Sequence, residues 1–316
     1  MRLAIGTGSE YGPRKPPSGH SQGIMPPSSV PSSRIWRNMG LWVTNWLDLL
    51  ILDQHQHALE EQMSQHQDDT DRQYHIGLSR GDAAAKILLA GDPERVRRSA
   101  ARLDSIEGEW SCREYLTITG EWRGERVTLM ATGIGASNIE IAMVELAAIV
   151  DDPVLIRAGS CGGIDPKIQL GDLVVSWGAV RMENTSTTFV PEGYPSVSHP
   201  DVIQALLQQA RQKEYPVHLG ITATAPGFYG AQGRNVNGFP PRHPDVIEEL
   251  ARIGVANMEM EASALFTLAS VKGWRAGCVC TVFGRRHHDE FVPVAEKPAL
   301  EDRCVEVALD ALLSID

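Results

Sequence analysis

Two glutamates stand close together where an apolar segment gives way to a helical pattern. Glu259 and Glu261 flank Met260, and apolar residues then recur at helical spacing, so we predict a helix with one apolar face that ends at Gly273. Two carboxylates are costly in an apolar core, but each accepts several hydrogen bonds, which suits a grip on vicinal hydroxyls. The alternative is that Glu261 only stabilises the helix N-terminus and that Glu259 is solvated.

Two arginine-bearing turns are predicted to follow short apolar strands. One runs from Gly91 to Arg95, and the other runs from Arg157 to Gly163 and includes Ser160. Such turns expose backbone N–H groups, so together they would offer guanidiniums, a hydroxyl and amides to one oxyanion. Neither turn is a P-loop or a dinucleotide fingerprint. The alternative is that these glycines serve only the tight turns themselves.

A third polar segment, the loop over residues 227–234, contains Phe228, Gln232 and Arg234. A glutamine amide presents an acceptor and two donors in one plane, which matches one edge of a pyrimidine ring. Arg234 would donate to a ring carbonyl and Phe228 would stack on the ring. The alternative is a polar surface loop with a buried phenylalanine.

The composition is that of an ordinary globular enzyme with an acidic balance. The chain has 316 residues and a net charge of -11, which argues against binding to nucleic acid or to acidic membranes. Arginine greatly outnumbers lysine, which suits bidentate binding of a small anion. Five cysteines without a Cys-x-x-Cys pair indicate neither a disulfide framework nor a zinc site. They favour a reducing compartment, so we expect a cytoplasmic protein without a metal.

The elements that must position these residues alternate between strand and helix. This alternation predicts an α/β fold with a largely central sheet. Strands are predicted over 87–90, 126–131, 154–156, 172–177, 218–224 and 275–283, and helices are predicted from Pro93, from a cap at Asn138, over 200–212, over 244–253, after Glu261 and near the C-terminus.

The first part of the chain differs from the rest. Residues 1–33 are rich in proline, glycine and serine, and residues 54–73 are rich in glutamine and histidine. The histidines His55, His57 and His66 could bind a metal, but a solvated segment explains them as well. We therefore expect residues 1–71 to be a largely disordered or peripheral extension, and residues 72–316 to form the functional domain.

Four motifs, in one order, resemble those of the uridine phosphorylases in the nucleoside phosphorylase-I family. They are Gly91-Asp92-Pro93-x-Arg95, Arg157-x-Gly159-Ser160-x-Gly162-Gly163, Phe228-Tyr229-x-x-Gln232-x-Arg234 and Glu259-Met260-Glu261. The resemblance covers roughly residues 75–316. It implies a single-domain, three-layer α/β fold whose distorted, partly barrel-like mixed sheet is flanked by helices. It also implies a homodimer, or a hexamer of dimers, with sites shared across the interface.

The resemblance also implies a role for each residue of the site. Phosphate would be bound by Gly91, Arg95, Arg157 and Ser160, ribose by Glu259, Met260 and Glu261, and the base by Phe228, Gln232, Arg234 and Arg286. Arg113 and His75 resemble residues that reach phosphate and ribose from the neighbouring subunit. The implied catalytic residues are Gln232, Arg234 and Arg286.

The implied reaction is phosphorolysis of a pyrimidine ribonucleoside, with inorganic phosphate as a co-substrate and no cofactor. Asn138 stands where bacterial relatives have a serine near a monovalent-cation site, while Glu114 is kept, so potassium stays open. The segment 283–286 also departs from the family pattern, and it contains no carboxylate of the kind expected in purine enzymes. The alternatives are a purine or methylthioadenosine enzyme, including a hydrolase, and an inactive nucleoside-binding protein.

Overall fold

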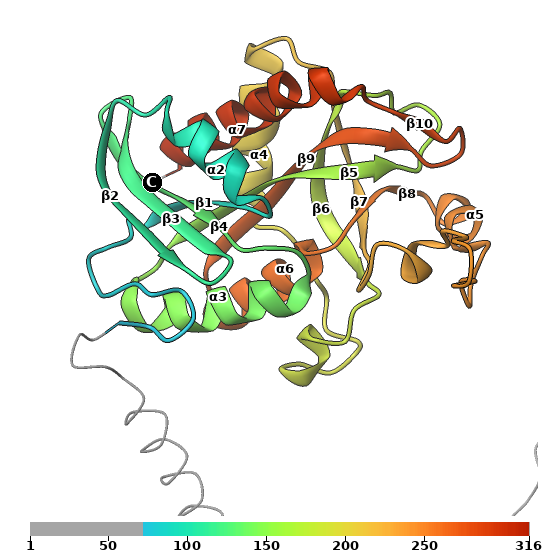
Figure 1. The fold of residues 1–316 in the computed structure, drawn as a ribbon, viewed down its shortest axis with the longest axis horizontal. Helices are drawn as coiled ribbons and strands as arrows, with labels where there is room; N and C mark the ends of the chain where they lie inside the picture. Colours follow the sequence, from blue (N-terminus) through green and yellow to red (C-terminus); the bar gives the residue numbers. More distant parts are fainter. Residues whose placement is uncertain (1–71, 316) are drawn as a thin grey trace, which may run out of the picture. The chain divides into compact units, whose positions relative to one another are not determined.

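The structure, a computed structural model, describes residues 72–315. Residues 1–71, with the three histidines considered above, lie outside the described residues. The described part is a single α/β domain in which six α-helices flank one ten-stranded mixed sheet (Figure 1). The predicted α/β class and the partly barrel-like sheet are confirmed. Within residues 72–315, no helix is long and apolar enough to cross a membrane.

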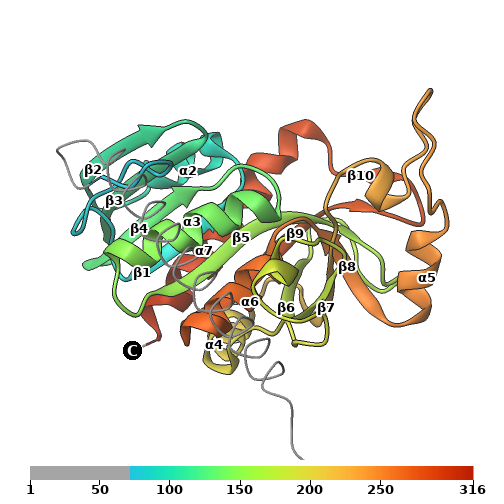
Figure 2. The same ribbon diagram turned by 90° about the horizontal axis from the view of Figure 1, so that it is seen from below.

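One part of the sheet closes into a ring. The strand order is β10-β9-β6-β7-β8-β5-β1-β4-β3-β2, and β9 also pairs with β5, so β5, β9, β6, β7 and β8 close on themselves. The remaining strands continue from β5 as an open sheet (Figure 2). The bounds are β1 Lys86–Ala90, β2 Ser105–Cys112, β3 Tyr115–Trp122, β4 Glu125–Ala131, β5 Val154–Gly163, β6 Leu173–Arg181, β7 Val217–Thr224, β8 Val255–Glu259, β9 Arg275–Arg285 and β10 Glu290–Phe291.

Strand β5 corrects one prediction, because the segment from Arg157 to Gly163 is strand and not a glycine-rich turn. It pairs with β9 along its whole length and reaches β8 at its last two residues. A Cβ atom on Gly159 would lie 2.9 Å from both Arg157 Nη2 and Cys280 Sγ. Glycine is needed at this position because the Arg157 side chain folds back over the strand, and not because the chain turns there.

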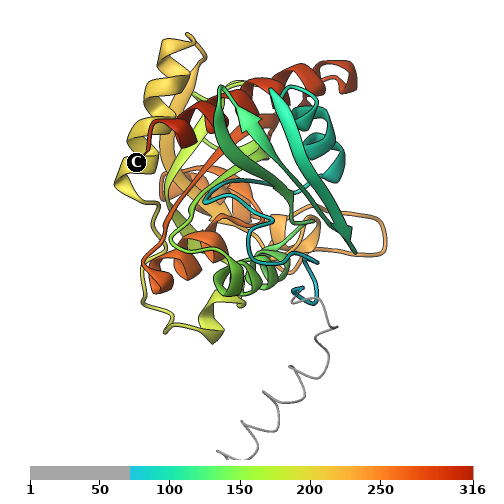
Figure 3. The ribbon, with the colours of Figure 1, turned by 90° about the vertical axis from the view of Figure 1, so that its left-hand side faces the viewer.

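The helices cover both faces of the sheet. Helices α2, α4 and α7 lie on one face, and α3 and α6 lie on the other (Figures 1 and 3). Helix α3 packs on α6, α4 packs on α7, and α5 packs beside β8. The bounds are α2 Pro93–Ala100, α3 Ala136–Ile149, α4 Pro200–Gln212, α5 Val246–Arg252, α6 Ala262–Lys272 and α7 Lys297–Leu313.

Most of the predicted elements are confirmed, but two predictions about the helices are wrong. Helix α3 begins at Ala136 after Gly135, whose φ of 101° favours glycine, so Asn138 lies inside the first turn. Helix α6 has no exposed face over residues 262–269, since every one of these residues is buried. The helix packs against α3 on one side and against the sheet on the other. The five cysteines are free thiols in the structure.

Candidate functional site

A pocket of about 940 Å³ lies where β1, β5, β8 and β9 end. All but two of the predicted site residues line it. The lining includes Gly91, Arg95, Arg157, Ser160, Phe228, Gln232, Arg234, Glu259, Met260, Glu261 and Arg286. Segments that lie far apart in the sequence, from Gly91 to Arg286, therefore meet at one site.

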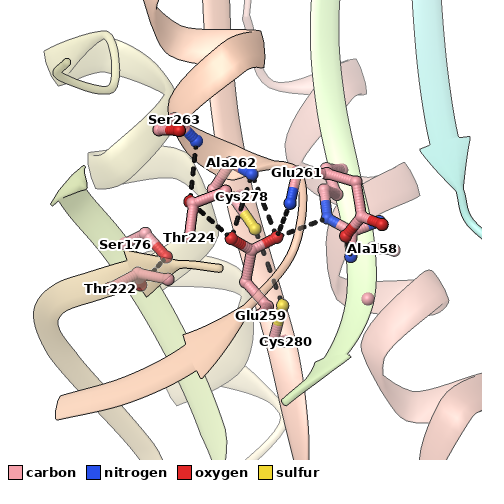
Figure 4. A network of polar contacts seen from close by, with 12 residues as sticks. Ala158, Ser176, Thr222, Thr224, Glu259, Glu261, Ala262, Ser263, Cys278 and Cys280 are labelled. Atoms are coloured by element: carbon pink, nitrogen blue, oxygen red, sulfur yellow. Dashed lines mark hydrogen bonds and ion pairs between the residues drawn. The ribbon is translucent and has the colours of Figure 1, made fainter. Parts of the chain in front are cut away.

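The two glutamates differ in their surroundings, although both are only 3% exposed. Glu259 accepts hydrogen bonds from the backbone N–H groups of Glu261 and Ala262, at 2.8 and 3.0 Å, and from the Thr224 hydroxyl at 2.7 Å. Figure 4 shows this carboxylate surrounded by its donors at the start of α6. Glu259 thus stabilises the N-terminus of α6 and is not solvated, so this part of the alternative interpretation is wrong.

Glu261 contacts the start of α3 as well as Arg157. It accepts a hydrogen bond from the backbone N–H of Gly135 at 2.6 Å and another from Arg157 Nη2. Gly135 immediately precedes α3, so Glu261 links the N-terminal ends of α3 and α6. Because this carboxylate also lines the pocket, its lone pairs are the ones placed to accept hydrogen bonds from a sugar.

Arg157 joins both carboxylates and is only 4% exposed. Its Nε donates to Glu259 at 3.1 Å, and its Nη2 donates to Glu261. Burial alone would lower the pKa of Arg157, but Glu261 and Glu259 outweigh burial and hold that pKa well above its usual value. Its Nη1 is buried and has no hydrogen-bond partner among residues 72–315. An unsatisfied charged donor beside a pocket favours the binding of an anion.

Arg95 is held in a similar way near Arg157. Its Nη1 donates to the backbone oxygen of Ala158 at 3.0 Å, and its Nη2 donates to Glu301 at 2.8 Å. Its Nε is buried and is likewise without a partner in the described part of the chain. Ser160 follows Ala158 by two residues on β5 and lines the same end. Two fixed guanidiniums and a hydroxyl therefore meet at one end of the pocket.

Three polar residues form the opposite end. Arg286 Nη2 donates to the backbone oxygen of Gln232 at 2.6 Å, and the Arg234 guanidinium lies 4.2 Å from the centre of the Phe228 ring. Burial lowers the pKa of Arg286 to about 10, and the neighbouring Arg234 adds to this effect. Arg286 therefore remains charged at neutral pH. An amide and two guanidiniums suit a planar ring that gains negative charge on its carbonyl oxygens.

His75 and Arg113 do not line the pocket but lie together elsewhere. The Arg113 guanidinium lies 5.1 Å from the centre of the Tyr74 ring, and its Nη2 lies 3.2 Å from the Tyr74 hydroxyl. The Tyr74 and His75 rings pack edge to face at 4.7 Å. His75 Nδ1 is 2.6 Å from Glu145, which also accepts a hydrogen bond from the backbone N–H of Ile76. None of these contacts involves a residue that lines the pocket.

Several pocket residues were not predicted from the sequence. Phe291 and Lys297 line the pocket, and Lys297 Nζ lies 5.5 Å from the centre of the Phe283 ring. Phe291 reaches the pocket because β10 pairs with β9 and its ring covers Gly284. A two-residue strand after a polar turn has no periodic pattern, so no sequence signal could have indicated this contact.

Comparison with known proteins gives consistent matches. Residues 86–315 match the family model described as the phosphorylase superfamily. A uridine phosphorylase of Thermococcus kodakarensis is 44% identical over 229 residues, which cover 72% of this chain and 82% of that protein. The uridine phosphorylase of Escherichia coli K12 is 33% identical over 243 residues, which cover 75% of this chain and 96% of that protein.

The chain is also similar to a purine enzyme and to a solved structure. A DeoD-type purine nucleoside phosphorylase of a Jannaschia species is 33% identical over 242 residues, with 76% of this chain and 99% of that protein covered. The fold is similar to the crystal structure of a Trypanosoma brucei nucleoside phosphorylase that shows uridine phosphorylase activity. That similarity has a TM-score of 0.73 at 26% identity and covers 78% of this chain and 99% of the other.

Proposed function

Because the chain belongs to the phosphorylase superfamily, we propose that it catalyses the phosphorolysis of uridine. Uridine and phosphate are converted into uracil and ribose 1-phosphate, so the enzyme is a pentosyltransferase. One observation carries this proposal: Arg95 and Arg157 are buried, each has a donor without a partner among residues 72–315, and they share a pocket with Glu261 and with Gln232, Arg234 and Arg286. The relatives named uridine phosphorylase, and the structural neighbour that shows uridine phosphorylase activity, support the choice of base.

The reaction needs no nucleophilic side chain. The bond between C1′ of the ribose and N1 of the base breaks, and its electron pair leaves with the base. Phosphate held by Arg95, Arg157 and Ser160 supplies negative charge beside the oxocarbenium-like sugar and then an oxygen for the new C1′–O bond. Glu261 holds the ribose hydroxyls, with Met260 against the sugar, and Glu259 keeps Arg157 and the start of α6 in place. Catalysis is therefore positioning and charge stabilisation.

The base end of the pocket stabilises the leaving group. Negative charge grows on the uracil carbonyls as the bond breaks, so the amide of Gln232 and the guanidiniums of Arg234 and Arg286 bind the ring more strongly in the transition state. Phe228 packs against the ring. These interactions accelerate the reaction because they are weaker with the neutral substrate.

A pyrimidine fits this end better than a purine. The carboxylates that line the pocket, among residues 72–315, are those of Asp92, Glu114, Glu259 and Glu261. None of them belongs to the β9–β10 hairpin, and Asp289 in its turn is not part of the lining. A purine enzyme needs an acid beside N7 of the base. Asp289 interacts with Arg234 and Arg286, but the residues that line this end offer an amide and guanidiniums and no carboxylate. Purine activity is therefore the weaker candidate, although DeoD-type enzymes are among the relatives.

The first prediction is that uracil release depends on phosphate. The ultraviolet absorbance of uridine is followed with the purified enzyme, with and without phosphate, and the sugar product is identified. We expect cleavage only with phosphate, and ribose 1-phosphate as the product. Cleavage without phosphate would indicate a hydrolase, binding without cleavage would indicate an inactive nucleoside-binding protein, and faster cleavage of inosine would indicate a purine enzyme. Each of these results would contradict the proposal.

A second copy of the chain is proposed to complete the site. His75 and Arg113 are held in one cluster outside the pocket of their own chain, as expected of residues that serve a neighbour. Arg113 would add a third guanidinium to the phosphate, and His75 would contact the ribose. The functional unit is thus a homodimer or an assembly of dimers. The absence of a disulfide among the five cysteines agrees with a cytoplasmic enzyme.

The second prediction is that turnover does not require potassium. The Asn138 Nδ2 group donates to the backbone oxygen of Ile134 at 3.3 Å. A Cβ atom on Gly133 would lie 2.5 Å from this nitrogen and 3.2 Å from Glu114 Cγ, so the amide fills the space beside Glu114. We expect equal rates in potassium and in tetramethylammonium buffers, and a gain of potassium dependence in Asn138→Ser. Strong stimulation of the wild-type enzyme by potassium would refute this.

A further inference from the structure

Glu301 connects two helices behind the anion end of the pocket. It lies in the second turn of α7, and its side chain is only 11% exposed. Its Oε1 accepts from Arg95 Nη2 at 2.8 Å, and its Oε2 accepts from Arg98 Nη2. Both arginines belong to α2. No motif of the sequence singles out this glutamate, and it does not line the pocket.

The contacts of Arg95 show what this carboxylate controls. The guanidinium is anchored at two corners, by Glu301 and by the backbone oxygen of Ala158 on β5. Two anchors on one rigid plane fix its orientation, since the planar fork has no internal rotation. The Nε group, which has no partner among residues 72–315, then has a defined direction. Without Glu301, Arg95 would keep only the contact to Ala158 and could rotate.

We propose that Glu301 is a positioning residue for phosphate, which acts by holding the guanidinium of Arg95 in its binding orientation. The inference rests on the proposed function, because it assigns Arg95 to the phosphate. Burial opposes the ionisation of Glu301, but hydrogen bonds from Arg95 and Arg98 outweigh it and hold the pKa of Glu301 below its usual value. The carboxylate is therefore ionised at neutral pH. Its negative charge also reduces the repulsion between Arg95 and Arg98, which lie on the same helix.

The third prediction tests this role with Glu301→Gln and a matched control, Asp302→Asn. Asp302 is the next residue of α7 and binds Arg98 Nε at 3.0 Å, but no contact to Arg95 is described for it. We expect Glu301→Gln to raise the KM for phosphate by roughly tenfold to a hundredfold. The KM for uridine should change by less than about threefold, because the nucleoside does not contact Arg95. Asp302→Asn should leave both constants near the wild-type values.

Three outcomes would overturn the inference. They are an unchanged or lower KM for phosphate in Glu301→Gln, equal losses for phosphate and uridine, and an equal effect of Asp302→Asn. If Glu301→Gln does not fold, Glu301→Asp carries the test alone, because it keeps the buried charge but withdraws the carboxylate from Arg95. The same phosphate-specific rise is expected for it, and wild-type constants would contradict the proposal.

Calorimetry with inorganic phosphate alone separates this inference from the proposed function. If the wild-type enzyme binds phosphate but does not cleave uridine with it, the proposed function fails while the role of Glu301 is still measurable as weaker binding. If the wild-type enzyme cleaves uridine and the Glu301 variants bind phosphate as tightly as it does, only the positioning role fails.

Discussion

Replacing Arg234 with alanine is expected to lower kcat for uridine by two to three orders of magnitude. The guanidinium lines the base end of the pocket and is held by its contacts with Phe228. In the proposed reaction it stabilises charge that exists only once the bond to the base is breaking. Loss of one such donor typically costs ~3–4 kcal/mol of transition-state stabilisation. The KM for phosphate should change little, because this end of the pocket does not contact the anion.

Arg285→Ala is the matched control for this variant. Arg285 is next to Arg286 in the sequence but pairs with Glu290 at 3.0 Å and does not line the pocket. The Arg285→Ala variant should retain near-wild-type turnover. Both proteins should unfold at nearly the wild-type temperature, since Arg234 makes no ion pair described in the structure. Near-wild-type uridine cleavage by Arg234→Ala would contradict the assignment of the base end.

Replacing Arg157 with lysine is expected to reduce kcat/KM for phosphate by roughly a hundredfold or more, the cost of one charged donor in a preorganised site. Arg157 binds Glu259 and Glu261 at once and still has Nη1 for an anion. A lysine carries the same charge but has a single nitrogen and no planar fork. It therefore cannot bind Glu259, Glu261 and the anion at the same time. The two carboxylates would remain partly compensated, and we expect a folded protein with a lower melting temperature.

The comparison variant is Arg126→Lys. Arg126 also binds one carboxylate through two nitrogens, with Nε and Nη2 at 2.6 and 2.8 Å from Glu107, but it does not line the pocket. Steady-state kinetics and thermal unfolding are measured for both variants. Arg126→Lys shows what the loss of an arginine–carboxylate pair does to stability, and any additional loss of activity in Arg157→Lys is then due to the anion site. If Arg157→Lys retained full phosphate affinity, Arg157 would not be part of the anion site.

The local part of the fold was predictable from the sequence, and the ring closure was not. Alternating apolar strands and capped helices have short-range signals, and β1, α4, β7 and α7 follow them. The ring depends on β9 pairing with β5 over more than a hundred intervening residues. No local pattern encodes such a pairing. The β2–β3 hairpin was also missed, because β2 is mostly polar and has no fully buried residue.

The residues of the site could be predicted only to the extent that short motifs contain them. The turn assigned to Arg157 was wrong because its glycines make room for a side chain rather than for a bend. Glu259 was expected to bind ribose, but its described partners are Arg157, Thr224 and the start of α6. Its binding of ribose stays a prediction. Glu301 lies 206 positions from Arg95, and nothing in the sequence relates the two.

The most direct measurement is a crystal structure of the enzyme with phosphate and uridine, or with phosphate and uracil. We expect one phosphate within hydrogen-bonding distance of Arg95, Arg157 and Ser160, and the ring of the base beside Phe228, with its carbonyl oxygens within reach of Gln232 and Arg234. Glu261 should face the sugar between them. Phosphate bound elsewhere, with both buried guanidiniums still unpartnered on their pocket side, would contradict the central claim that these two arginines hold the attacking anion.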